Sequence, residues 1–167
     1  INTQAGNELS PKEYVAFQIL EYVLLDAPGA PLKKALLDAG IGDDIMGGYE
    51  YGILQPYFSV IAKNAEREQK DEFVKVVKSP LRNLVDGGIE KKSLKAGINN
   101  YEFQYREADY GSAPKGLMYG LQCLDSWLYG GDPMMHLEYE DTFAALKKGA
   151  DSGYFEGLIR TYRLAAP

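Results

Sequence analysis

The sequence contains one histidine, His136, and one cysteine, Cys123, among 167 residues. A catalytic zinc ion takes about three protein ligands, usually from histidine, cysteine and carboxylate side chains. The only local cluster with a nitrogen ligand is His136, Glu138 and Glu140. Carboxylate–imidazole pairs four residues apart share a helix face and are common on protein surfaces. We therefore expect that this chain binds no metal ion.

The same scarcity restricts covalent and cofactor chemistry. No serine stands in a Gly-x-Ser-x-Gly elbow, and neither a Walker motif nor a strand-linked Gly-x-Gly-x-x-Gly is present. Cys123 cannot form an internal disulfide, and its apolar neighbours favour a buried structural thiol. Carboxylate pairs could be drawn from any of the 24 acids, so they point to no particular site. We assign no catalytic residue and no cofactor-binding residue.

The chain also has few basic residues and only short apolar runs. The chain has 18 lysines and arginines against 24 acids, a net charge of -6, whereas nucleic-acid binding needs a cationic surface. The longest apolar-rich segment, Tyr14–Leu25, is interrupted by Gln18 and Glu21 and is shorter than the roughly 20 residues that cross a bilayer. The polar N-terminus does not resemble a signal peptide. We expect neither a nucleic-acid nor a membrane partner.

Local signals predict a helix-rich α+β domain. Ser10, Pro11 and Glu13 form a capping signal that starts a helix reaching Leu25. A second helix runs to Ala39, and Gly47-Gly48 breaks the chain before a strand. Antiparallel strands are predicted at 49–51 and 55–63, and further helices at 65–85, 91–108, 115–129, 140–147 and 152–162. Proline inside a helix costs about 3 kcal/mol, so Pro80 predicts a kink or two abutting helices.

Three segments together resemble one protein family. They are Ala27–Asp44 with its Pro-Gly-Ala-Pro bracket, Tyr101–Gly111, and the run Asp125-Ser-Trp-Leu-Tyr-Gly130. In this order they resemble the pitrilysin/insulinase-type zinc metallopeptidases, in their presequence-protease branch. The resemblance covers most of residues 1–167 and is less clear after Leu164. The zinc motif of that family, His-x-x-Glu-His, cannot occur in a chain with one histidine.

The resemblance implies that residues 1–167 form the second, non-catalytic domain of a larger zinc metallopeptidase. Its fold would be a metallopeptidase-like αβ roll, a helix-rich layer packed on a small antiparallel sheet, with the N-terminal strands truncated. Because the chain begins with Ile1 rather than Met, we interpret it as an excised or processed piece. Zinc would lie in another domain of the parent protein, and the other domains of that polypeptide would be the partners.

The resemblance further implies that the parent degrades short, unfolded peptides in a chamber that this domain helps to form. The expected location is the cytoplasm, or an organelle matrix if the parent is eukaryotic. An isolated domain would expose apolar surface, so we expect it to form a homodimer or to bind hydrophobic dyes. The alternative is a free-standing peptide-binding or scaffold module of the same fold. Micromolar peptide affinity of the isolated domain would favour that alternative.

Five residues are structural or interdomain candidates. Pro31 and Leu32 belong to an Ala-Pro-Leu element, which the resemblance implies to be a packing and capping feature. Glu102 and Arg106 stand four residues apart on a predicted helix. We interpret them as an arginine held by carboxylates between two layers, with a polar, aromatic strip facing a substrate chamber as the alternative. Trp127 is predicted to pack in the core or against another domain.

Overall fold

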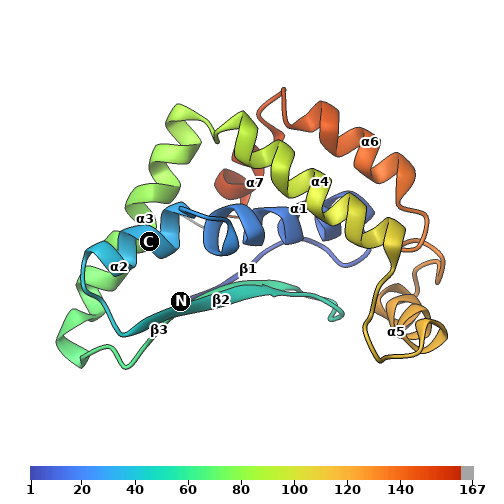
Figure 1. Cartoon of the computed structure of the whole chain (residues 1–167), viewed down its shortest axis with the longest axis horizontal. Helices are drawn as coiled ribbons and strands as arrows, with labels where there is room; N and C mark the ends of the chain where they lie inside the picture. The colour runs from blue at the N-terminus through green and yellow to red at the C-terminus, as the bar shows by residue number, and fades with distance from the viewer. Residues whose placement is uncertain (163–167) are drawn as a thin grey trace.

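A computed structural model of the chain describes residues 1–162. A three-stranded sheet forms one layer, and α1 (Pro11–Glu21) and α2 (Pro31–Asp38) lie across it (Figure 1). On the side of α1 away from the sheet lie α4 (Lys91–Glu107) and α6 (Glu140–Gly149). This is the predicted α+β arrangement of helices on a small antiparallel sheet. The residues after Leu164, where the resemblance is less clear, lie outside the described residues.

The sheet has the strand order β1-β3-β2 with both pairs antiparallel. Its strands are β1 (Asn2–Gln4), β2 (Asp44–Glu50) and β3 (Tyr57–Lys63). The prediction that Gly47-Gly48 breaks the chain was wrong, because both glycines lie inside β2. A Cβ atom at Gly48 would lie 3.0 Å from a carboxylate oxygen of Glu21. Glycine in this strand therefore makes room for the helix above it.

The middle layer is a helix that is buried on most of its sides. Ser10 caps α1 by accepting a hydrogen bond from the Glu13 N–H (3.4 Å), and Pro11 takes the first helical position. The helix continues as a π-helix, η1 (Tyr22–Asp26). Its fully buried side chains include Phe17, Ile19, Leu20 and Leu24. Burial of one such side chain contributes roughly 1.5–3 kcal/mol, so this helix contributes several such increments to the stability of the domain.

The other helices follow the predicted boundaries closely. α2 ends with Gly40 at φ 65°, where the Ile41 N–H donates to Leu36 O and the Gly40 N–H donates to Leu37 O, a Schellman motif. After a 3₁₀ turn (Arg67–Gln69), α3 (Lys70–Gly87) runs through Pro80 as one helix. The alternative of two abutting helices was therefore wrong, and the kink stays a prediction. The buried Val77 and Leu81 flank Pro80 and offset the lost backbone hydrogen bond.

The C-terminal helices differ in how they join the body. α6 and α7 (Tyr154–Thr161) bury Phe143, Leu146, Phe155 and Ile159 in the common core. α5 (Lys115–Trp127) instead lies at one end of the molecule, far from α2 and α3 (Figure 1). Its only fully buried residue is Ser126. The space between α5 and the body is where the candidate site lies.

Candidate functional site

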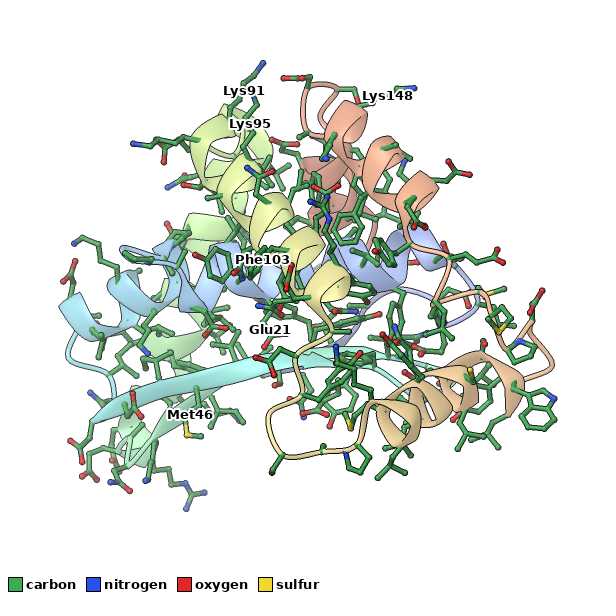
Figure 2. All side chains as sticks on the ribbon, turned by 45° about the vertical axis from the view of Figure 1, so that its right-hand side comes forward. Glu21, Met46, Lys91, Lys95, Phe103 and Lys148 are labelled. Carbon is green, nitrogen blue, oxygen red and sulfur yellow. The ribbon has the colours of Figure 1, made fainter. Side chains whose placement is uncertain are left out.

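A cavity of about 710 Å³ opens between α1, α4, α5 and the end of β2. Tyrosine is its dominant side chain. Tyr14 comes from α1, Tyr49 and Tyr51 from the end of β2, and Tyr101 and Tyr105 from α4. Figure 2 shows Glu21, another lining residue, between α4 and β2. The lining therefore combines aromatic rings with carboxylate and amide side chains.

Tyr14 connects the separate walls of this cavity. Its hydroxyl donates to Asp125 Oδ2 of α5 (2.8 Å), and its ring meets the Tyr51 ring edge-on at 5.1 Å. The other face of Tyr14 stacks on His136, with ring centroids 3.9 Å apart. Burial raises the pKa of the Tyr14 hydroxyl above its ordinary value, with the nearby Tyr105 and Asp125 adding to the effect. Tyr14 is therefore a neutral donor that orients Asp125.

Two carboxylates line the cavity. Glu21 accepts a hydrogen bond from the Tyr49 N–H through Oε2 (3.1 Å), and Asp125 accepts from Tyr14. Burial raises the pKa of both carboxyl groups above their ordinary values, and these two hydrogen bonds oppose the shift. Arg106 also belongs to the lining, but its side chain is 65% exposed and its guanidinium lies 3.8 Å from Glu102.

Glu8 and His136 are buried titratable groups close to the cavity. Glu8 Oε1 accepts from the Gly52 N–H (3.1 Å), whereas Oε2 and both ring nitrogens of His136 have no partner among the described residues. Burial raises the pKa of Glu8 to about 8. Burial also lowers the pKa of His136 to about 4, and a weak contact with the Glu8 backbone, outside the geometric limits of a hydrogen bond, partly opposes the shift. Near neutral pH, Glu8 is therefore largely protonated and His136 is neutral.

α5 exposes an apolar stripe. Its leucines at positions 117, 121, 124 and 128 are spaced for one helix face, and Leu117, Leu121 and Leu128 are exposed. Trp127 is 64% exposed, so the core alternative for this residue is wrong. The prediction of a buried Cys123 is also wrong, because this thiol is only partly buried. Both errors have one cause, since the described residues cover little of α5.

Three other candidates, Pro31, Leu32 and Glu102, are not among the residues that line the cavity. Pro31 takes the first position of α2, and Leu32 is fully buried beneath it. Glu102 bridges two helices, because its carboxylate contacts Lys147 of α6 at 2.7 Å and Arg106 at 3.8 Å. No local signal predicts the contact with Lys147, which lies 45 residues after Glu102 in the chain. The neighbouring Tyr101, Gln104 and Tyr105 line the cavity. The seam formed by Glu102 and Arg106, and the strip facing a substrate chamber, both stay predictions.

The histidine cluster does not fit the zinc ion of the resembled family. Across residues 1–162, no three histidine, cysteine or acidic side chains are grouped to hold a metal ion. His136 is 3% exposed and packs flat on Tyr14. A structural zinc site needs four convergent ligands and a catalytic one needs three. No chemical step through a metal can be derived from these side chains.

Residues 3–101 match the protein family described as Peptidase M16 inactive domain. The chain belongs to the M16 peptidase family. The matched segment runs from β1 into α4 and so includes the sheet, α1 and α3. The resemblance to the non-catalytic domain of a pitrilysin/insulinase-type zinc metallopeptidase is thereby confirmed.

Two relatives are similar to this chain beyond the matched segment. HypA of Clostridium perfringens is 46% identical over 164 residues, which is 98% of this chain and 17% of HypA. Presequence protease 1, chloroplastic/mitochondrial, of Arabidopsis thaliana is 32% identical over 134 residues, which is 80% of this chain and 12% of that protein. The chain thus spans less than a fifth of the length of either relative.

Solved structures share the fold at low sequence identity. The inactive peptidase domain from Bordetella parapertussis has a TM-score of 0.66 and 13% identity, covering 98% of this chain and 81% of that one. A structure from Bordetella pertussis Tohama I has a TM-score of 0.68 and 14% identity, covering 90% of this chain and 83% of that one. These neighbours confirm the predicted M16 fold.

Within residues 1–162, no helix is long and apolar enough to cross a membrane.

Sequence reasoning missed the cavity itself. Tyr14, Glu21 and Asp125 come from distant parts of the chain, and no local motif relates them. The one available signal was the high tyrosine content, 13 of 167 residues. Tyrosine is favoured where an apolar ring is buried and its hydroxyl stays hydrogen-bonded.

Proposed function

We propose that residues 1–167 are one non-catalytic domain of a larger zinc-dependent metalloendopeptidase that degrades short, unfolded peptides. The domain forms part of the chamber wall and packs against other domains of the same polypeptide. Another domain supplies the zinc ion and the catalytic residues. The cytoplasm is the proposed location, or an organelle matrix if the parent is eukaryotic.

The exposed apolar stripe of α5 carries this proposal. Leu117, Leu121 and Leu128 of the stripe are 57%, 48% and 66% exposed. Trp127, next to Leu128 in the chain, is 64% exposed, and exposed apolar side chains grouped on one element mark an interaction site. α5 is held to the body chiefly by polar contacts. The Tyr14 hydroxyl donates to Asp125 (2.8 Å), and the Gln122 amide donates to His136 O (3.1 Å). These contacts hold α5 while most of the stripe stays exposed, so another domain can cover it.

We expect the 167-residue chain to bind a hydrophobic dye or to form a dimer, since the stripe is uncovered. Trp127→Gln together with Leu128→Gln should reduce both effects severalfold and leave the melting temperature almost unchanged, because both side chains are exposed. Dye fluorescence and size-exclusion chromatography with light scattering provide the measurements. Leu37→Gln on α2, which is 46% exposed, is the matched control and should have little effect.

If the 167-residue chain were a monomer that binds no dye, the proposal that another domain covers the α5 stripe would be contradicted. It would favour the free-standing peptide-binding module instead. Equal effects of the α5 variant and Leu37→Gln would also contradict the proposal, because they would show that the stripe has no special affinity for apolar partners.

A further inference from the structure

The segment that contains α5, residues 111–130, stands apart from the hydrophobic core. The helices on either side of it are anchored in that core, α4 by Ile98 and α6 by Phe143. Within residues 111–130, all of which the structure describes, only Ser126 is buried and no side chain packs in the core. Segments with few buried apolar contacts open locally at a lower free energy than the whole domain unfolds. Residues 111–130 are therefore the part of the domain that detaches most easily.

Side-chain hydrogen bonds join this segment to the rest of the domain. They are Tyr14 Oη to Asp125 Oδ2 (2.8 Å), Gln122 Nε2 to His136 O (3.1 Å) and Tyr129 Oη to Gly52 O (3.2 Å). The bond from Tyr14 is the shortest of these and ends on a carboxylate. Hydrogen bonds to a charged group are stronger than those between neutral groups. The Tyr14–Asp125 bond is therefore the strongest of these links.

Both ends of the segment contain residues in the left-handed conformation. Gly111 has a φ of 58° between α4 and α5, and Gly130 has a φ of 81° after α5. Hinges in proteins are a few loop or helix-end residues that absorb changes of φ and ψ, and glycine does so with the least steric hindrance. The buried Ser126 donates to Asp132 O (2.7 Å), close to Gly130. The one buried contact thus lies beside a hinge, where movement is smallest.

The segment covers one wall of the cavity described above. Met118, Leu121 and Gln122 line the cavity from α5. Behind them, Gln18 of α1 also lines the cavity but is only 4% exposed, and its amide donates to the Tyr105 hydroxyl (3.3 Å). Movement of α5 away from α1 would uncover Gln18 without disturbing the core.

We propose that residues 111–130 form a hinged flap that opens away from the cavity while the core stays folded. The hydrogen bond between Tyr14 and Asp125 is the latch that keeps the flap closed. The flap then controls how readily other molecules reach the tyrosine-lined wall. This inference depends only on contacts within the chain, so it stands or falls separately from the proposed function.

Labelling of a buried thiol by a small reagent measures the opening. Cys123 is the only cysteine, so Cys123→Ser gives a background without thiols. In that background, Gln18→Cys places one thiol behind the flap. Val77→Cys places one in the core, where Val77 is 2% exposed. The Gln18→Cys thiol should react at least about a hundredfold faster, because the flap opens without unfolding of the domain.

Removal of the latch should accelerate this reaction. Tyr14→Phe keeps the ring that stacks on His136 but removes the donor hydroxyl, so labelling of Gln18→Cys should become about tenfold faster. Asp125→Ala removes the same bond from the α5 side and should have a similar effect. The two changes together should accelerate labelling less than the product of their separate effects, because they remove one shared bond.

Tyr162→Phe is the matched control. It removes a tyrosine hydroxyl that donates to a carboxylate elsewhere, Glu13 Oε2 (2.7 Å). This bond breaks when the domain unfolds but stays intact when the flap opens, so labelling of Gln18→Cys should not change. Three results would overturn the flap: equal labelling rates of Gln18→Cys and Val77→Cys, no acceleration by either latch variant, or the same acceleration by Tyr162→Phe.

Discussion

Phe17→Ala is expected to lower the free energy of unfolding by about 3–5 kcal/mol. Phe17 is fully buried in the middle layer, where its ring stacks on Tyr49 at 5.2 Å and meets Tyr162 edge-on at 5.3 Å. Truncation removes contacts with β2 and with the end of α7 at once. The cavity left by the ring cannot close easily, because α1 is held between the sheet and the outer helices. Urea unfolding followed by circular dichroism measures the loss.

Leu37→Ala is the control for this substitution. Leu37 is 46% exposed on α2, so its truncation should change the free energy of unfolding by no more than about 0.5 kcal/mol. If Phe17→Ala were as mild as Leu37→Ala, α1 would not be the packed centre of the domain.

Stability is expected to fall as the pH rises from about 6.5 to 8. Burial raises the pKa of Glu8 from the usual 4.5 to about 8, so the folded state binds more protons than the unfolded state over this interval. The free energy of unfolding then decreases by about 1.4 kcal/mol per pH unit, roughly 2 kcal/mol in all. His136 has the opposite effect at lower pH. Its folded-state pKa of about 4 lies below the usual 6.5, so its contribution to stability is lost as the pH falls through that range.

Glu8→Gln isolates this effect. The glutamine oxygen can keep the hydrogen bond from the Gly52 N–H (3.1 Å), but the side chain can no longer ionise. The decline between pH 6.5 and 8 should disappear in urea unfolding curves recorded at several pH values. Glu138→Gln, at an exposed position, should keep the decline. The same slope in Glu8→Gln and the unchanged chain would show that Glu8 is not the group responsible.

The helices could be predicted because their signals are local. Ser10 and Pro11 start α1, and Gly40 ends α2 in a left-handed conformation. Gly47-Gly48 misled the prediction because glycine can also serve inside a strand, where a neighbouring side chain approaches closely. That neighbour, Glu21, lies 27 residues earlier in the sequence, and the contact depends on the packing of α1 on β2.

The candidate site could not be predicted for the same reason. Its carboxylates and tyrosines converge only when α4 and α5 fold against α1. The predictions of a buried Cys123, and of Trp127 in the core or against another domain, rest on apolar neighbours, which normally indicate burial. In this chain α5 turns its apolar stripe outward, which a periodicity argument cannot distinguish from a core-facing stripe. The Glu102–Lys147 contact likewise depends on how α4 and α6 pack.

The reading frame upstream of the codon for Ile1 tests the central claim most directly. Sequencing that region of the gene should show a preceding domain in the same frame that carries a His-x-x-Glu-His motif. This result would make the chain the supporting domain of a zinc metallopeptidase. A start codon close to Ile1, with no such domain before it, would contradict the account and leave a free-standing peptide-binding module as the better explanation.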